Sequence, residues 1–380
     1  MAIIYLDSFD GYTTAEIGTY WFNNAAGVGG QISTSSGDAR TGTGCYRPPP
    51  SGVARGLHSP PIGNVTFGTG TGSLKNEVII GAAIKMDLAA STFIFQFQLS
   101  RNAALGGTPD ADLTSSFVQG SLHINNDQTL RIAIGTGPGA ITLGVTNVAD
   151  VVHPTAYNYY EWHVQFGTSG FSEVRINNKV VQSGNIMQSA VPVTIGTAST
   201  VNRDKAEMFL IASLGGGGAP VAYDDLYILD PTTGTNTTYF GDSRVNCFMP
   251  SGTGSNTQFT TFGSASNWQN VNEIPADDDT TYNFGTASGK IDDYAHTTLA
   301  TNSLALNGVQ SWAKIKDPDG SNTTFGIVLD SSGTVYVTNT NTAASTYTEF
   351  QEVWDTIGTT TTGWTAADFN ASTFGVEDLG

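Results

Sequence analysis

The stretch YNYYEWHVQFGTSGFSEVRINNKVV, residues 157–181, decides the fold. In its first half, apolar side chains occupy every second position: Tyr160, Trp162, Val164 and Phe166. In its second half, Val174, Ile176 and Val180 are predicted to share one face. A period of two is typical of half-buried antiparallel strands. The Asn177-Asn178 pair suits the positive φ of a tight hairpin turn. The stretch therefore predicts an antiparallel β-sandwich and argues against a fold built for nucleotide chemistry.

Short apolar segments separated by Gly, Thr, Ser and Asn continue along the chain, which is typical of an all-β protein. Strands are predicted before residue 231 at 3–6, 77–87, 92–99, 117–125, 128–135, 140–145, 205–214 and 221–229. Weaker strands are predicted after it at 244–249, 309–316, 325–330, 334–339 and 347–356. Tyr282, Tyr294 and the Trp residues 268, 312, 354 and 364 are expected to supply the second core. A single helical turn is predicted at 365–370, with Thr365 as its N-cap.

The length of 380 residues favours two domains. A polar, Thr-rich stretch at 232–238 is predicted to be a linker. We therefore expect a β-sandwich at 1–231 and a second, smaller β-rich domain at 239–380.

Composition excludes several classes of function. The chain has 15 basic and 33 acidic residues, a net charge of −18, and no run of Lys or Arg. This argues against nucleic acid and anionic membranes as partners. No apolar run approaches the ~20 residues of a membrane span, and the N-terminus lacks the basic region of a signal peptide. We expect synthesis in a cytoplasm without a signal peptide, and two free thiols at Cys45 and Cys247.

Several motifs resemble those of bacteriophage virion proteins that carry a concanavalin-A-like (laminin-G-like) sandwich. In the first half these are LDSFDGY at 6–12, Tyr20-Trp21, DARTGTG at 38–44, the 157–181 stretch and AYDDLYILD at 222–230. In the second half they are GDSRV at 241–245, Trp268, DDD at 277–279, GWT at 363–365 and FGV at 374–376.

The resemblance implies a non-enzymatic virion structural protein, either a head (capsid) decoration or a tail or fibre-type component, with a role in host adsorption. It implies capsid or tail proteins as partners and a homo-oligomer, with a trimer favoured over a dimer. The second domain would serve virion attachment or oligomerisation. An alternative is a lectin-like, carbohydrate-binding receptor-binding protein that recognises a host surface glycan. A polysaccharide-degrading enzyme is the third hypothesis.

Catalytic motifs are missing from the sequence. The Glu-x-Asp-x-x-Glu pattern of sandwich glucanases does not occur, and Glu161 and Glu173 each stand alone on a strand, where we expect them to face solvent. There is no GxSxG elbow and no HExxH pair. The sequence therefore predicts no enzymatic activity and no required cofactor.

Four acidic residues are weak candidates for a Ca²⁺ site: Asp7, Asp10, Asp224 and Asp225. Strand alternation places the Asp224 and Asp225 carboxylates on opposite faces, so they are not expected to bind one ion together. First and last strands often neighbour one another in sandwiches, so one of this pair could join Asp7 or Asp10. The other hypothesis is that these carboxylates accept hydrogen bonds from loop N–H groups.

Flat aromatic rings that stack on sugars are the other candidate site. Four tyrosines near strand ends or off the core alternation are the candidates for glycan contact: Tyr157, Tyr159, Tyr223 and Tyr227. Partial burial or a subunit contact is the alternative for each of them.

Overall fold

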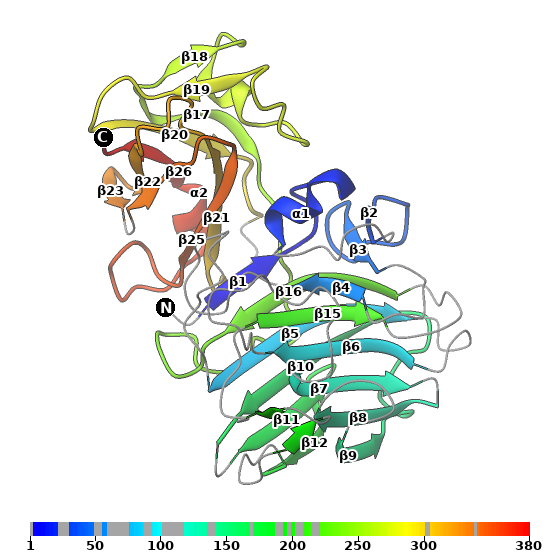
Figure 1. The fold of residues 1–380 in the computed structure, drawn as a ribbon. Coiled ribbons are helices and arrows are strands. Elements are labelled where there is room, and N and C mark those ends of the chain that lie inside the picture. The colour runs from blue at the N-terminus through cyan, green and yellow to red at the C-terminus, as the bar shows by residue number, and fades with distance from the viewer. Residues whose placement is uncertain are drawn as a thin grey trace.

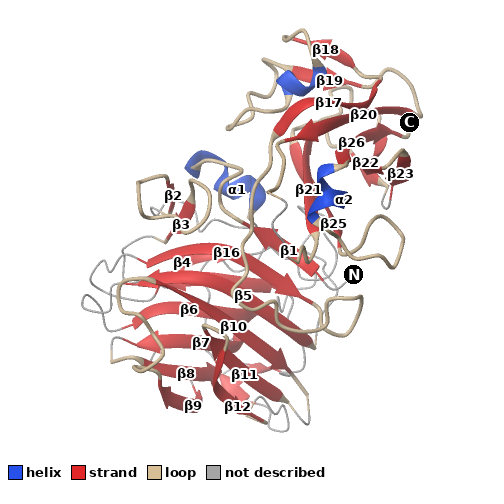
Figure 2. Ribbon diagram, turned by 180° about the vertical axis from the view of Figure 1, so that it is seen from behind, coloured by secondary structure: helices blue, strands red, loops and turns tan. Residues whose placement is uncertain are grey.

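A computed structural model describes residues 3–21, 30–48, 55–58, 76–86, 93–100, 118–125, 127–134, 141–167, 170–186, 193–195, 199–201, 208–213, 221–300, 305–337 and 340–380. It shows two β-rich units, one at each end of the molecule (Figure 1). Strands dominate both units, and the helices are short (Figure 2). The prediction of an all-β fold that begins with an antiparallel β-sandwich is confirmed.

The first unit contains two antiparallel sheets. The sheet that we call the β5 sheet has the order β12 (Lys179–Gly184), β11 (Phe171–Ile176), β10 (Tyr157–Gln165), β5 (Glu77–Met86), β16 (Val221–Leu229), β3 (Cys45–Arg47) and β2 (Gln31–Ser33), with β1 (Ile3–Asp7) also paired to β16. The other, the β7 sheet, has the order β4 (Arg55–His58), β15 (Met208–Ser213), β6 (Phe93–Ser100), β7 (Val118–Asn125), β8 (Thr129–Ile134) and β9 (Ile141–Asn147). The pairing of β1 with β16 confirms that the first and last strands of this unit are neighbours.

Smaller elements complete the first unit. β13 (Val193–Ile195) pairs with β14 (Ser199–Val201), and η1 (Thr14–Glu16) leads into α1 (Ile17–Tyr20). The core lies between the two large sheets and includes the side chains that the alternation of residues 157–181 placed inside: Tyr160, Trp162, Val164, Phe166, Val174 and Ile176. Trp162 is fully buried, and its Nε1 donates to Ser172 Oγ at 3.0 Å.

The Asn177-Asn178 turn is confirmed, with φ of 51° and 66° between β11 and β12. The inward position of Val180 was wrong, because this side chain is 47% exposed. A bulge shifts the β11–β12 register between Val174 and Arg175, which breaks the alternation that the sequence pattern assumed.

The second unit contains a sheet with the order β17 (Pro250–Thr257), β20 (Lys290–His296), β26 (Ser372–Asp378), β22 (Thr324–Ser331) and β23 (Thr334–Val337), with β24 (Asn341–Thr342) also paired to β22. Two ribbons accompany it, β18 (Thr260–Phe262) with β19 (Tyr282–Phe284), and β21 (Val309–Ile315) with β25 (Thr348–Trp354). Its helical turns are η3 (Asn267–Asn270) and α2 (Ala366–Asn370). The N-cap at Thr365 is confirmed, since Thr365 Oγ1 accepts from Asp368 N at 3.1 Å.

The predicted strand at 244–249 was wrong, because the next strand begins at Pro250. β17 has the sequence PSGTGSNT and is an edge strand of its sheet. It has no apolar periodicity from which the strand could have been predicted. The domain boundaries at 231 and 239 stay a prediction.

The β21–β25 ribbon joins the two units. Trp312 was expected in the second core, but its ring packs against the first unit, 6.0 Å from Tyr5 and 5.1 Å from Tyr20. Gln310 Oε1 accepts from Leu6 N at 2.7 Å, and its Nε2 donates to Leu6 O at 3.1 Å. One amide side chain therefore pairs with the free edge of β1 as another strand would. None of the helices in the described ranges is long and apolar enough to cross a bilayer.

The Trp162→Ala variant tests the core. Because Trp162 is fully buried between the sheets, its truncation should lower the free energy of unfolding by about 3–5 kcal/mol. Val180→Ala is the matched control, and we expect it to stay within about 0.5 kcal/mol of the parent. Chemical denaturation measures both. Equal effects of the two substitutions would contradict the assignment of faces.

Candidate functional site

Asp7 is the centre of a buried hydrogen-bond network built from the LDSFDGY and Tyr20-Trp21 motifs. Its Oδ2 accepts from Tyr12 Oη at 2.7 Å, Trp21 Nε1 at 2.9 Å and Tyr5 Oη at 3.1 Å. Its Oδ1 accepts from Phe9 N at 2.7 Å. Burial raises the pKa of Asp7 to about 6, although these donors oppose the rise. Both oxygens are committed to protein donors, which is the structural alternative to Ca²⁺ binding.

Asp10 orders the loop of the DARTGTG motif. Its Oδ1 accepts from Thr43 N at 2.7 Å and from Gly44 N at 2.6 Å. Gly42 has a φ of +60°, and a Cβ there would lie 2.0 Å from Asp10 Oδ2. Glycine is therefore needed at 42 for both its backbone angle and its lack of a side chain.

Asp224 and Asp225 both face the loop at 40–41, which corrects the prediction that strand alternation separates them. β16 bulges between Asp224 and Tyr227, and Asp225 has a φ of 52°. Asp224 Oδ2 accepts from Arg40 N at 2.6 Å and Thr41 N at 3.0 Å. Asp225 Oδ2 accepts from Arg40 Nη1 and Thr41 Oγ1, both at 3.0 Å. A bulge adds a residue to one strand, so successive side chains no longer alternate.

The Asp224–Asp225 pair also holds the segment that follows the first unit. Asp225 Oδ1 accepts from Val245 N at 2.9 Å, and Arg40 Nη1 donates to Ser243 O at 3.1 Å. Arg40 Nη2 pairs with Asp242. Burial raises the pKa of both carboxyls of the pair, and repulsion from Asp225 adds to the rise at Asp224. Arg40 therefore stabilises two buried carboxylates and pins residues 242–245 to the sandwich.

The outer face of the β5 sheet is covered by residues 239–241. Glu161 was expected to face solvent, but it is 1% exposed. Its Oε1 accepts from Gly241 N at 2.7 Å and from Tyr227 Oη. The ring of Tyr227 lies 4.7 Å from that of Phe240. Around Glu161 and Tyr227 this face is therefore an internal contact surface. We call it, together with the contacts of Arg40 and Asp225 to residues 242–245, the joint.

Three of the four tyrosines proposed for glycan contact lie within this packing, namely Tyr157, Tyr159 and Tyr227. Tyr159, Tyr223 and Tyr227 are buried, so they are not an exposed stacking platform. Tyr159 Oη donates to Asp225 O at 3.1 Å, and Tyr223 lies in the core between the sheets. Tyr157 is partly exposed, and its hydroxyl donates to Asp38 O. The expectation that all four rings lie off the core alternation or near strand ends was wrong for Tyr223, because the bulge between Asp224 and Tyr227 puts Tyr223 and Tyr227 on opposite faces. For the outer rings, alternation did not show that residues 239–241 cover them.

Metal binding gains no support from the described residues. They contain no group of three or more His, Cys, Asp or Glu side chains placed to hold an ion. Asp7 and Asp10 do not share a site with Asp224 or Asp225: Asp7 accepts from Phe9 N, while Asp10 and Asp224 accept from different residues of the 38–44 loop. The DDD motif is engaged too, with Asp278 paired to Lys314 and Asp279 to Lys316. Ca²⁺ ligation at these residues would have to displace existing donors.

The β7 sheet carries polar side chains on its outer face. Leu122 and Ile124 point into the core, so the intervening residues of β7 point away from it. We call the following residues of β7 and β8 the polar row: Ser121, His123, Asn125, Thr129 and Arg131. His123 lies directly opposite Arg131 in the register, and Arg131 lies opposite Val145, which is 59% exposed.

The side chains of the polar row range from buried to partly exposed. His123 is 3% exposed, and its Nε2 lies 2.8 Å from Ser121 Oγ. Asn125 Nδ2 donates to Thr129 Oγ1 at 2.9 Å. Burial, together with the charge of Arg131, lowers the pKa of His123 to about 4, so its imidazole is neutral at neutral pH. Ser121 and His123 are therefore the buried part of the row, and Asn125, Thr129 and Arg131 are its partly exposed part.

Sequence reasoning missed this row. The alternation of Ser121, His123 and Asn125 with apolar neighbours was visible, and it marked a strand with a polar face. The pairing of His123 with Arg131 depends on the register between β7 and β8, which no short motif encodes.

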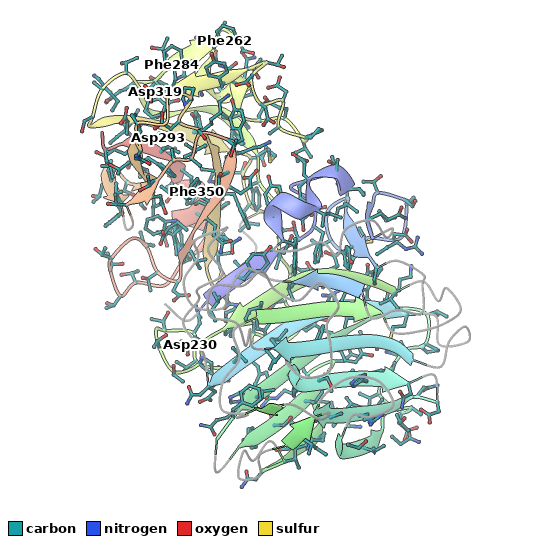
Figure 3. All side chains as sticks on the ribbon, in the orientation of Figure 1. Asp230, Phe262, Phe284, Asp293, Asp319 and Phe350 are labelled. Atoms are coloured by element: carbon teal, nitrogen blue, oxygen red, sulfur yellow. The ribbon has the colours of Figure 1, made fainter. Side chains whose placement is uncertain are left out.

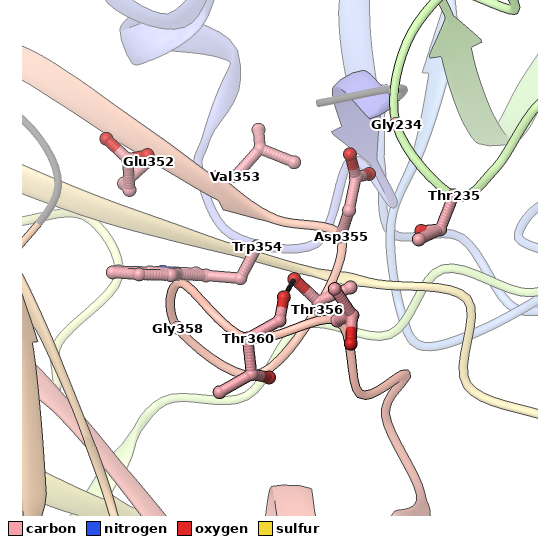
Figure 4. A pocket seen from close by; sticks show the side chains of 10 residues that line it. Gly234, Thr235, Glu352, Val353, Trp354, Asp355, Thr356, Gly358 and Thr360 are labelled. Atoms are coloured by element: carbon pink, nitrogen blue, oxygen red, sulfur yellow. Dashed lines mark hydrogen bonds between the residues drawn. The ribbon is translucent and has the colours of Figure 1, made fainter.

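A pocket of about 370 Å³ lies where the two units meet (Figure 4). Its lining is rich in small and polar residues: Gly234, Thr235, Glu352, Val353, Trp354, Asp355, Thr356, Gly358, Thr360 and Thr361. Asp355 Oδ1 accepts from Ile3 N at 2.8 Å, and Thr356 Oγ1 donates to Thr360 O at 2.8 Å. These polar groups bind β1 and order the loop after β25, so the pocket is part of the contact between the two units and not a separate ligand site.

Comparisons with known proteins give neighbours in fold only. No protein-family model matches the chain, and no curated protein matches it. An endo-β-1,4-glucuronan lyase from the fungus Trichoderma reesei is 17% identical over 55% of this chain and 90% of its own, with a TM-score of 0.35. A carbohydrate esterase from the Shiga toxin-encoding bacteriophage phi24B is 14% identical over 54% and 88%, with a TM-score of 0.34. The carbohydrate-binding module CBM66 from Bacillus subtilis is 6% identical over 56% and 96%, with a TM-score of 0.34.

The prediction that the chain is not an enzyme is corrected by these comparisons, because a polysaccharide lyase and a carbohydrate esterase are among the similar structures. The prediction rested on the missing carboxylate pattern of glucanases, and that pattern concerns glycoside hydrolysis alone. Its absence does not exclude other reactions on saccharides.

Substituting Arg40 tests the joint. The Arg40→Ala variant leaves Asp225 buried with only the half-exposed Arg244, 3.7 Å away, as a cation, and we expect a loss of about 3–5 kcal/mol in the free energy of unfolding. Residues 242–245 should also become more susceptible to protease. Arg47→Ala is the control, because the Arg47–Asp38 pair is partly exposed and should contribute at most about 1 kcal/mol. A loss at Arg40 no larger than that at Arg47 would contradict the role of the joint.

His123 should make stability depend on pH. Its pKa is about 4 in the folded chain, below the ordinary value of 6.5. Its contribution is therefore present above pH 6.5 and is lost as the pH falls through 4, because the unfolded chain takes up the proton first. From pH 7 to pH 4 the parent should lose up to about 3 kcal/mol relative to His123→Asn. Denaturation curves of both proteins measure this, and parallel pH profiles would contradict the burial of a neutral imidazole.

Proposed function

We propose that this chain is a saccharide-binding component of a phage particle and that it binds its ligand on the outer face of the β7 sheet. The observation that carries the proposal is the partly exposed part of the polar row, in which Arg131 is the cation beside Asn125 and Thr129. Saccharides are recognised through hydrogen bonds to hydroxyl groups and carboxylates, which amide, hydroxyl and guanidinium groups provide. The outer face of the β5 sheet is excluded from this role around Glu161 and Tyr227, since residues 239–241 cover it.

Arg131 favours a saccharide that carries a carboxylate, because a guanidinium pairs with a carboxylate through two parallel hydrogen bonds. The net charge of −18 opposes the approach of an acidic polymer. Salt screens that repulsion over about 8 Å at physiological ionic strength, whereas the pair at Arg131 forms at contact distance.

Arg131→Gln tests the proposal. We expect the parent to be retarded in gels that contain acidic polysaccharides such as alginate or hyaluronate. The variant should bind about tenfold more weakly or worse, since a hydrogen bond to a charged group contributes ~1.5–3 kcal/mol. Lys179→Gln, which removes the same charge from an exposed position on β12, is the matched control. The proposal fails if no acidic polysaccharide binds, or if both variants bind as the parent does.

A second candidate function is acid–base chemistry on the same ligand. The observation in its favour is that His123 lies opposite Arg131 in the register; because His123 is 3% exposed, a ligand reaches the imidazole only after the side chains around it move. A neutral base can remove a proton from the carbon beside a carboxylate, and a cation at that carboxylate stabilises the charge that develops. Unsaturated products from alginate that disappear in His123→Ala would support this function over binding alone.

The place in the particle belongs to the same proposal and is supported by the motif resemblance. We expect the chain in purified virions, as a head or tail component in contact with capsid or tail proteins, and as a homo-oligomer, with a trimer favoured. Antibody labelling of intact particles and light scattering of the isolated protein test these expectations.

A further inference from the structure

An exposed aromatic face lies at the end of the second unit, away from the sandwich (Figure 3). β18 and β19 pair so that Phe262 is opposite Tyr282 and Thr260 is opposite Phe284. These four side chains share one face of the ribbon, because alternate residues of a strand point the same way. Phe262 is 50% exposed and Phe284 is 40% exposed. Large aromatic side chains that remain in water on one face indicate a contact surface.

The rings form a continuous surface. The centroids of Phe262 and Tyr282 lie 4.8 Å apart with planes 23° from parallel. Those of Tyr282 and Phe284 lie 6.1 Å apart at 50°. Three rings thus follow one another across the ribbon.

The opposite face of the ribbon is fixed by amide side chains. Asn283 Nδ2 donates to Asn267 O at 2.8 Å and to Tyr294 Oη at 3.0 Å. Asn270, which is buried, donates to Tyr282 O at 3.1 Å and to Asn283 Oδ1 at 2.9 Å. Asn267 Nδ2 donates in turn to both oxygens of the buried Asp292 at 2.8 Å. The network holds the backbone beneath the rings, so the face is ordered before any ligand arrives.

The two lysines beside this face are already paired with carboxylates. Lys314 pairs with Asp278 and Lys316 with Asp279, and both ammonium groups lie over the ring of Tyr347. With these lysines engaged in a chain of net charge −18, the tip offers little attraction to an anionic polymer. An uncharged partner loses no ion hydration when it contacts the rings.

We propose that the aromatic face of Phe262, Tyr282 and Phe284 is a stacking platform for an uncharged saccharide chain. The apolar C–H faces of successive sugar rings would lie on the aromatic rings. Thr260, which shares the face, would bond a sugar hydroxyl. This second saccharide site is separate from the polar row in place and in chemistry, so either can fail without the other.

Affinity electrophoresis of the full chain tests the platform with soluble uncharged polysaccharides, namely dextran, galactomannan and xyloglucan. We expect at least one to retard the parent, and the Phe262→Ala, Phe284→Ala double variant to bind about tenfold more weakly or worse. Phe262→Trp should retain binding because it keeps a flat ring. Val335→Ala removes another exposed apolar side chain, 38% exposed, and should have no effect.

Three results would overturn the proposal. One is that none of the uncharged polysaccharides retards the parent. Another is that the double variant, with an unchanged circular dichroism spectrum and melting temperature, binds as the parent does. The third is that the double variant loses self-association in light scattering without any change in saccharide binding, since the face would then be a contact between copies of this chain. Loss of alginate binding in Arg131→Gln with intact binding of an uncharged polysaccharide would separate this site from the polar row.

Discussion

The buried contact between Arg40 and Asp225 holds residues 242–245 against the sandwich. Asp225 is fully buried and would be costly to ionise without a cation, and Arg40 supplies one while also donating its backbone N–H to Asp224. Both carboxylates reach the same loop only because β16 bulges at this point. The bulge therefore allows residues 242–245 to bind to the sandwich, and it thereby positions the start of the second unit. The second unit contacts the sandwich through residues 242–245 and through the β21–β25 ribbon, which packs against β1.

The joint also decides which surfaces remain for a ligand. It covers the outer face of the β5 sheet around Glu161 and Tyr227, where an open sandwich would offer a binding surface. The polar row of the β7 sheet and the aromatic face of β18 and β19 lie outside it. These two surfaces differ in chemistry, one with a guanidinium among hydroxyl and amide groups, the other with exposed rings. A protein with both surfaces could bind acidic and uncharged saccharides at separate places.

Local periodicity was enough to predict much of the fold. The alternation around Trp162 and the apolar run of β16 correctly placed strands and core residues, because a side chain's direction in a regular strand follows from its position alone. The cap at Thr365 was equally readable, since it needs only a few adjacent residues. The polar edge strand β17 was missed because it carries no apolar pattern.

The candidate site was less predictable, for physical reasons that particular residues show. Alternation put Glu161 and Tyr227 on the outer face correctly, but it could not show that residues 239–241 would bury that face. The Asp224–Asp225 pair was misplaced because a bulge is a local exception to the period of two. His123 and Arg131 become neighbours only through the register between two strands. Burial by distant segments and strand register are properties of the whole fold.

Hydrogen–deuterium exchange of the full chain, with and without alginate oligosaccharides, tests the central claim most directly. The claim is that ligand binds the outer face of the β7 sheet while the joint stays closed. We predict slower exchange in β7 and β8 (118–134) when ligand is present, and unchanged, already slow exchange at 240–246. Protection at 240–246 with none in β7 and β8 would contradict the account, because the ligand would then occupy the face that the chain itself covers.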